Sequence, residues 1–171
     1  MAMEKLKDWT GQQIPVIRYK GVFDWPGLYR LCRLWIEENR YRYYEKRYKH
    51  KGDEVEVDMI GLRKVDAMHR YNIGVHFHIW HLREIEVPKG TKTVKLNQAN
   101  VQVWIVPQVD IDYTERFADS KLARRIFKWW LEIRKRDINV NYVEALSKEL
   151  MELHTKIKTF LNMSSDVNYW T

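Results

Sequence analysis

Three histidines stand close together in the segment VHFHIWH, residues 75–81. His76 and His78 alternate with apolar residues, so both imidazoles project from the same face of an extended strand. Imidazole nitrogens are common ligands of zinc and other transition metals. The segment therefore raises the question of whether a metal site lies on this strand.

A second alternating segment carries carboxylates that can face these histidines. In EVEVDMIGLRKV, residues 54–65, acidic residues alternate with Val and Met. A hairpin that keeps all apolar residues on one side pairs positions of equal parity. Such a hairpin sets Asp58 opposite His76. It also sets Glu56 opposite His78. By the same rule, the next hairpin pairs His76 with Trp104 and His78 with Gln102.

This polar sheet face has two interpretations. Directly opposed Cβ atoms lie about 4.5–5.5 Å apart, so neighbouring ligands can converge on one divalent ion. The metal-site hypothesis uses two histidines and two carboxylates: His76, His78, Glu56 and Asp58. The alternative is a solvated face stabilised by opposite charges on adjacent strands. No HExxH or CxxC motif is present to support a metal site.

Hydrophobic periodicity predicts the elements that position these residues. Period-two segments, typical of strands, span 14–24, 41–49, 54–65, 71–87 and 93–111. Asp24 before a Pro predicts the start of a helix over 26–39. After residue 112 the period becomes helical, and Asn139 is predicted to open a second C-terminal helix. The first has an apolar face of Leu122, Ile126, Trp129 or Trp130, and Ile133.

The second C-terminal helix has an apolar seam about five turns long. Its residues follow a three–four spacing: Val143, Leu146, Leu150, Leu153, Ile157 and Phe160. We favour a helix packed on the sheet over a homodimer through residues 143–160. The element order predicts one α+β domain over 14–163, with a curved antiparallel sheet of about five to six strands. A flexible lead-in over 1–13 and a polar tail over 164–171, with Tyr169 and Trp170, flank it.

This order of one strand, one helix, four strands and two helices resembles the helix-grip, START-like fold. The resemblance implies a cavity between the sheet and the C-terminal helix. Three segments, YKGVFDWPGLYRL, KVDAMHRYNIGVHFHIWHLREIEV and ELMELHTKIKTFL, resemble an uncharacterised archaeal protein family. That resemblance implies an archaeal source, but it assigns no activity and no functional residues.

The length and composition of the chain indicate a folded protein without a disulfide or a membrane span. The chain has 171 residues, 45% of them hydrophobic, which is enough for a core and argues against disorder. Its one cysteine, Cys32, lies in an apolar helical pattern and indicates a core residue without a disulfide. No apolar run has the length of a signal peptide or a membrane span. We therefore expect a cytoplasmic protein.

The formal net charge is +7, which favours polyanionic partners. Residues 116–136 hold eight basic and two acidic residues, a net charge of +6. The residues predicted to contact RNA or the ribosome are Arg124, Arg125 and Lys128, with Arg40, Arg42 and Arg47 in or beside the second predicted strand. Two alternatives remain. The tryptophans of this helix form a core that the charges only surround, or the helix lies on anionic lipid.

Three functional hypotheses follow. We place first a non-enzymatic binding protein that holds a small apolar ligand between the sheet and the C-terminal helix. A basic RNA- or ribosome-associated protein comes second. A metal-dependent enzyme on the His76 and His78 face comes third. The sequence identifies no cofactor.

Overall fold

The computed structural model describes residues 9–10, 14–89, 92–114, 117 and 120–163. The tail predicted over 164–171, with Tyr169 and Trp170, lies outside these residues, as does most of the lead-in predicted over 1–13. Two residues of that lead-in, Trp9–Thr10, form the short strand β1.

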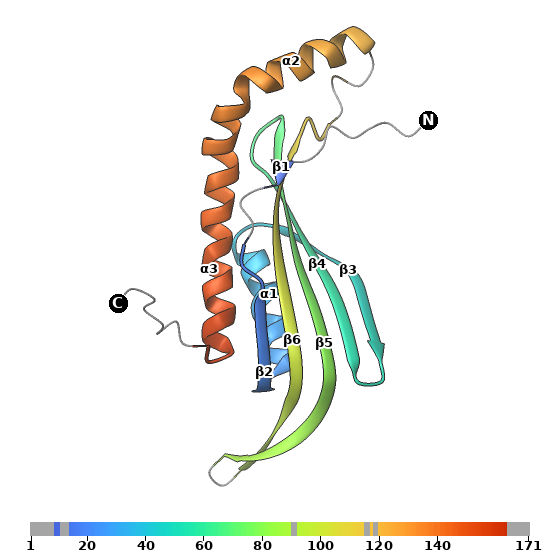
Figure 1. Ribbon diagram of the computed structural model, residues 1–171, viewed down its shortest axis with the longest axis vertical. Helices are drawn as coiled ribbons and strands as arrows, with labels where there is room; N and C mark the ends of the chain where they lie inside the picture. The colour runs from blue at the N-terminus through green and yellow to red at the C-terminus, as the bar shows by residue number, and fades with distance from the viewer. Residues whose placement is uncertain (1–8, 11–13, 90–91, 115–116, 118–119, 164–171) are drawn as a thin grey trace, which may run out of the picture.

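A six-stranded antiparallel sheet carries the fold (Figure 1). After β1, its strands are β2 (Ile17–Phe23), β3 (Arg42–Lys51), β4 (Glu54–Lys64), β5 (His69–Lys89) and β6 (Lys92–Ile111). The order across the sheet is β1-β6-β5-β4-β3, and β2 also pairs with β6. β1 and β2 therefore share one edge of β6 at different heights. The predicted α+β class and antiparallel sheet are confirmed.

The register of the two central hairpins is the predicted one. The predicted pairs all occur: Asp58 with His76, Glu56 with His78, His76 with Trp104, and His78 with Gln102. Because the side-chain period is two, this register puts Val55, Val57 and Met59 of β4 on one face and its three carboxylates on the other. The burial of β4 alternates accordingly from residue to residue.

A bulge interrupts the pairing of β5 with β6 between Trp80 and Arg83. His81 lies inside it with a φ of 59°, and its side chain is exposed. His81 has the odd parity of the core residues of β5 but lies outside the core, because the bulge changes which face later residues occupy. Beyond it, the β5–β6 hairpin continues past the other strands at the lower end of the molecule (Figure 1).

The first helix, α1 (Trp25–Glu38), begins where the sequence predicts. Asp24 is its N-cap, and the side chain accepts a hydrogen bond from the Gly27 amide at 3.0 Å. Pro26 occupies the first turn, where its missing N–H costs nothing.

The C-terminal helices form one continuous helix that bends near its middle. α2 (Lys121–Ile138) passes into a π-helical turn, η1 (Asn139–Val143), and then into α3 (Glu144–Phe160). Asn139 has helical backbone angles, so it does not open a new helix as predicted. α2 begins at Lys121 after the Ser120 N-cap, within the region after residue 112 where a helical period is predicted. Among the described residues, no helix is both long enough and apolar enough to cross a membrane.

α1 and α3 cover one face of the sheet and leave the other open to solvent. The seam of α3 is buried in one cluster with the sheet and α1. Its fully buried members are Leu146, Leu150, Leu153 and Ile157. The prediction of a long helix packed on the sheet is confirmed. A homodimer through 143–160 would require α3 to leave the sheet.

An ion pair fixes α3 to the sheet and to the end of α1. Arg63 of β4 makes two hydrogen bonds to the Glu149 carboxylate, at 2.8 and 2.6 Å. The same guanidinium donates to the Asn39 carbonyl at 2.8 Å and lies 4.2 Å from the centre of the Tyr41 ring. Paired donors on a carboxylate are directional, so this contact favours one position of α3 along the sheet.

Two neighbouring residues of α3 test this packing. Leu150 is 0% exposed and Met151 is 41% exposed. We expect Leu150→Ala to lower the free energy of unfolding by about 2–5 kcal/mol, because it leaves a cavity in the core. Met151→Ala should change it by no more than about 0.5 kcal/mol. Urea unfolding followed by circular dichroism measures both, and equal losses would contradict this rotation of α3.

Candidate functional site

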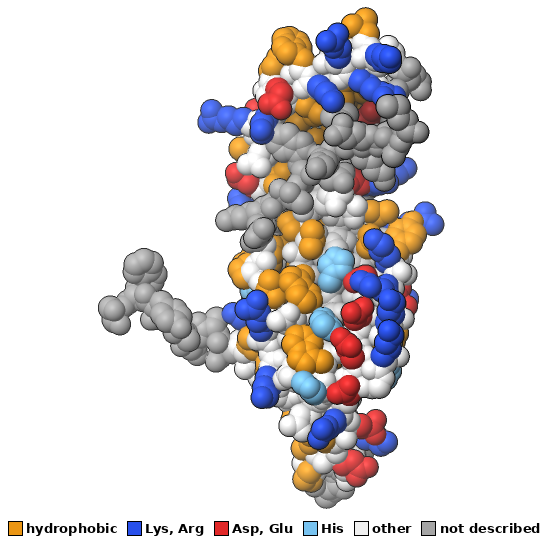
Figure 2. All heavy atoms as spheres, turned by 45° about the vertical axis from the view of Figure 1, so that its right-hand side comes forward, with side chains coloured by type: hydrophobic (Ala, Val, Ile, Leu, Met, Phe, Trp, Pro, Cys, Tyr) orange, Lys and Arg blue, Asp and Glu red, His pale blue; other side chains and the backbone are white. Residues whose placement is uncertain are grey.

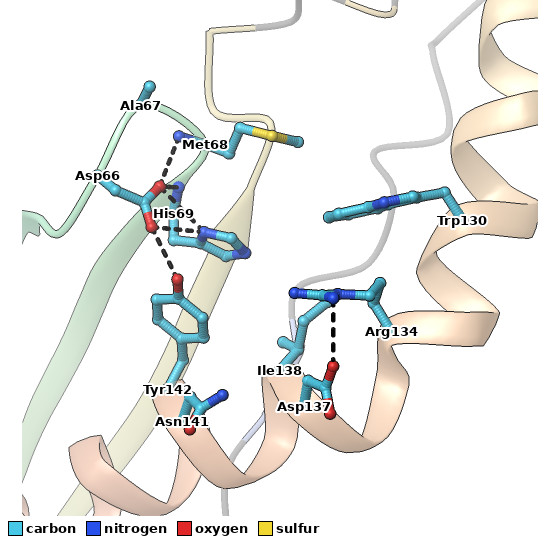
Figure 3. Close-up of a pocket in the computed structure, with 10 residues that line it drawn as sticks. All are labelled: Asp66, Ala67, Met68, His69, Trp130, Arg134, Asp137, Ile138, Asn141 and Tyr142. Carbon is cyan, nitrogen blue, oxygen red and sulfur yellow. Dashed lines mark hydrogen bonds and ion pairs between the residues drawn. The ribbon is translucent and has the colours of Figure 1, made fainter.

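A pocket lies where the turn between β4 and β5 meets the bend between α2 and α3 (Figure 3). We call it the elbow pocket. Its volume is about 320 Å³ and most of its lining is apolar. The lining residues are Asp66, Ala67, Met68, His69, Trp130, Arg134, Asp137, Ile138, Asn141 and Tyr142. Pockets of a few hundred Å³ are in the range that holds small ligands.

The turn side of the pocket is organised by Asp66. One oxygen of its carboxylate accepts hydrogen bonds from the backbone amides of Met68 at 2.7 Å and His69 at 2.8 Å. Asp favours such turns because its short side chain reaches amides two and three residues further on. The carboxylate also lies 2.9 Å from the His69 Nδ1 atom. The turn therefore presents the imidazole in one orientation.

Tyr142 joins this group from the helical side. Its hydroxyl donates to Asp66 Oδ2 at 2.9 Å. Its ring stacks on the His69 ring with centroids 4.1 Å apart and planes 17° from parallel. Tyr142 belongs to η1, and such π-helical turns are frequent at functional sites. The bond to Asp66 is also the largest of the effects that raise the pKa of Tyr142.

Four hydrogen-bond donors keep Asp66 ionised. Burial by itself raises the pKa of this carboxyl group. The amides of Met68 and His69, the Tyr142 hydroxyl and the His69 side chain together outweigh burial and lower the pKa to about 2. The carboxylate is thus a fixed negative charge whose donors come from the protein itself.

The second ring nitrogen of His69 lacks such a partner. Because Nδ1 faces the ionised Asp66 carboxylate, it carries a proton, and Nε2 is the remaining ring nitrogen. Nε2 is buried and has no hydrogen-bond partner among the described residues. In Figure 3 it points to the side of the pocket on which Trp130 lies. Most buried polar atoms are paired, so this one indicates where a hydrogen-bonding group of a ligand would be favoured.

The opposite wall comes from α2. Trp130 stacks on the buried Phe127, with centroids 5.8 Å apart and planes 14° from parallel. Arg134 and Asp137 form a pair at 3.4 Å, and both side chains are more than half exposed. The pocket thus has an aromatic wall on each side and a charged pair at its rim.

The ten described residues that line the elbow pocket include no Ser, Thr or Cys. Asp66 is held ionised, and its oxygens accept hydrogen bonds from internal donors. Cys32 is fully buried elsewhere, and burial raises the pKa of its thiol.

The open sheet face holds the residues of the metal hypothesis. A column of histidines lies beside columns of carboxylates and of basic side chains (Figure 2). Two histidines each bond a carboxylate: His76 Nδ1 lies 2.8 Å from Asp58, and His78 Nε2 lies 2.6 Å from Glu54. Among the described residues, the one group of three or more acidic or histidine ligand atoms that all lie within 4.8 Å of one another comes from Glu54, Glu56 and His78. The structure therefore brings two of the four predicted ligands together, with Glu54 in place of Asp58 and His76.

Arg47 forms ion pairs with two of the carboxylates on this face. Its guanidinium lies 2.8 Å from Asp58 and 3.3 Å from Glu56. The pKa of Asp58 is lowered, because its bonds to His76 and Arg47 outweigh the effect of burial. These contacts match the alternative prediction, in which opposite charges stabilise a solvated sheet face.

The residues predicted to bind polyanions lie on two separate elements. Arg124, Arg125 and Lys128 are on α2, which crosses the upper end of the molecule (Figure 1). The other three are in or beside β3, at the edge of the lower part of the sheet. Of these, Arg47 is held in ion pairs, Arg42 lies 5.2 Å from the centre of the Tyr44 ring, and Arg40 occupies a left-handed backbone position. The two groups do not form one continuous surface.

The buried face of α2 differs from the face predicted to be apolar. Phe127, Leu131 and Ile138 are buried against the body of the protein. The predicted apolar face is exposed, at Leu122, Ile126, Trp129 and Ile133. Trp130 is half-buried and Trp129 is exposed, so the alternative in which both tryptophans form a core is wrong for Trp129.

The main residues of the elbow pocket were not predicted from the sequence. The patterns in the sequence predict no role for His69, Asp66 or Tyr142. The sequence does contain one usable signal, because Asp followed three residues later by His, between two predicted strands, fits an Asp-stabilised turn. No local pattern relates this turn to Tyr142, which follows 73 residues after His69.

Comparison of the chain with protein-family models, with curated proteins and with solved structures gave no match. The resemblances to an archaeal family and to the helix-grip fold stay predictions. The function is argued below from the geometry of the sites.

Replacement of Asp66 tests whether its carboxylate stabilises the turn between β4 and β5. In Asp66→Asn the side-chain amide directs N–H groups at the Tyr142 hydroxyl and at His69 Nδ1, which are themselves donors. We expect the free energy of unfolding to fall by about 1–3 kcal/mol near neutral pH. Urea unfolding measures this change, and Asp137→Asn, which breaks only an exposed pair, should cost at most about 1 kcal/mol.

The effect of Asp66→Asn on the free energy of unfolding should depend on pH. The pKa of Asp66 in the folded chain, about 2, lies below the unfolded value of about 4. Its ionised form therefore stabilises the fold fully above pH ~4, and this contribution is lost as the pH falls towards ~2. The difference in stability between wild type and Asp66→Asn should shrink over that interval. A constant difference would contradict the role given to the Asp66 charge.

Proposed function

We infer that the protein is a non-enzymatic binding protein whose ligand occupies the elbow pocket. The ligand class that fits is a small, flat, mainly apolar molecule with at least one hydrogen-bond donor. The observation that carries this proposal is the pair of aromatic walls. The stacked rings of His69 and Tyr142 form one wall, and Trp130 forms the other.

The walls favour a planar ligand for a geometric reason. Trp130 is supported from behind by Phe127, and Tyr142 is held by its bond to Asp66. Aromatic rings that are fixed before binding lose little conformational freedom when a flat molecule contacts them. Aromatic pairs also contribute beyond the area that they bury.

Polar groups in the pocket favour an uncharged ligand with a donor. Asp66 and Asp137 bring two negative charges, and Arg134 brings one positive charge, so the lining offers an anion no net attraction. The unpartnered Nε2 atom of His69 favours a donor on the ligand. The exposed pair of Arg134 and Asp137 supplies both a donor and an acceptor at the rim.

The proposed function is still that of the first hypothesis, a protein that binds a small apolar ligand. The proposed cavity, however, lies at a different place in the structure. The helix-grip resemblance implies a cavity along the seam between α3 and the sheet. Large side chains of both layers pack against one another there, including Trp35, Phe77 and Leu150. The elbow pocket lies instead at the end of this interface, where α3 turns into α2.

Two adjacent tryptophans provide a matched test with N-phenyl-1-naphthylamine, a flat apolar fluorophore with a single N–H donor. Trp130 lines the pocket, whereas Trp129 is 68% exposed and does not. We expect the fluorophore to bind, and Trp130→Ala to raise its Kd about tenfold or more, because one aromatic wall is lost. Trp129→Ala should leave the Kd within about twofold, since its side chain lies outside the pocket.

Fluorescence titration measures each Kd, and far-ultraviolet circular dichroism shows whether each variant folds. Tyr142→Ala removes the other wall and should weaken binding in the same way. An equal loss in Trp129→Ala would place the fluorophore on the exposed side of α2 and overturn the proposal. Absence of binding to the wild-type protein would do so as well.

A further inference from the structure

A second apolar face on α2 has no role in the fold. Leu122, Ile126, Trp129 and Ile133 are 67%, 57%, 68% and 59% exposed. Their spacing of four, three and four residues places them on one side of the helix. We call this set the outer stripe.

The outer stripe faces away from the body of the protein. Trp129 is two residues from Phe127 and two from Leu131, and both of these are buried. Two residues along an α-helix correspond to a rotation of about 200°, so the stripe and the buried face lie on opposite sides. α2 extends past the end of the sheet in Figure 1. The exposure of all four residues shows that this side of the helix is turned outward.

Basic residues run beside the outer stripe. α2 contains seven basic and two acidic residues, a net charge of +5. Lys121, Lys128 and Lys135 recur every seven residues and therefore form one row along the helix. Arg125 and Arg136 lie between this row and the stripe, at positions set by the same helical period.

The charge decides among the partners that could cover this face. A second copy of the chain would bring two helices of charge +5 together, which is repulsive. A nucleic acid would neutralise the basic row, but its phosphates would leave the aliphatic side chains of the stripe in water. An anionic bilayer suits both the basic row and the outer stripe. Its headgroups meet the basic row, and the boundary between headgroups and acyl chains receives the apolar side chains of the stripe.

We propose that α2 docks on the surface of a bilayer that contains anionic phospholipids. The helix lies parallel to the membrane plane, with the outer stripe inserted at the boundary between headgroups and acyl chains. Trp129 sits at the level that tryptophan favours in membranes. The long lysine stems let their ammonium groups reach phosphates while the stripe enters the apolar region.

Vesicle flotation tests this proposal with the full chain. One set of vesicles contains equal amounts of phosphatidylcholine and phosphatidylserine, and the other contains phosphatidylcholine alone. We expect binding to the first set, at least about tenfold weaker binding to the second, and a steep loss when salt is added. The double substitution Ile126→Ser with Trp129→Ser should reduce binding to anionic vesicles about tenfold or more.

The controls separate this surface from the elbow pocket. Both serine substitutions are at exposed positions, and circular dichroism should show an unchanged fold. Trp130→Ala, which alters the pocket, should leave vesicle binding within about twofold. Lys121→Gln with Lys128→Gln should weaken binding to anionic vesicles while leaving weak binding to neutral ones unchanged.

Three results would overturn the proposal. Binding to neither vesicle set, together with RNA binding that depends steeply on salt, would make the basic row a nucleic-acid surface. Light scattering could instead give twice the monomer mass, reduced to one by the serine substitutions, which would make the stripe a contact between two copies. Equal vesicle binding by wild type and the double serine variant would exclude the outer stripe as the docking surface.

Discussion

The packing of one aliphatic seam on one apolar sheet face determines the rest of the structure. Leu146, Leu150 and Leu153 fit the sheet in a single rotation of α3, and the bond between Arg63 and Glu149 favours one position along it. Because the helix continues without a break into η1, this rotation also fixes where Tyr142 points. The elbow pocket and the outward direction of α2 are therefore consequences of the same core contact.

Much of the sheet follows from the sequence by elementary rules. Alternation of apolar and polar residues sets the parity of each hairpin, and a slip of one residue would expose the whole core face. The pairing of Asp58 with His76 and of Glu56 with His78 could therefore be predicted. The same argument explains why the carboxylates and histidines gather on the open face, where Arg47 shares their charge.

The site could not be predicted in the same way, because it depends on contacts distant in the sequence. The three–four spacing of α3 is unambiguous, but α2 has two apolar faces, and only the tertiary structure decides that Phe127 is buried and Ile126 exposed. Asn139 indicates a boundary between two helices, but no pattern there predicts that the chain bends through a continuous π-helical turn. His69 gains its role only when Tyr142 stacks on it from a helix that ends the domain.

The most direct test of the elbow pocket is a nuclear magnetic resonance titration of the isotopically labelled protein with N-phenyl-1-naphthylamine. Binding between the aromatic walls predicts the largest changes at the amides of Met68, His69 and Asn141 and at the indole N–H of Trp130. Changes centred on Leu122 and Trp129, with these signals unmoved, would contradict the account and place the ligand on the outer stripe.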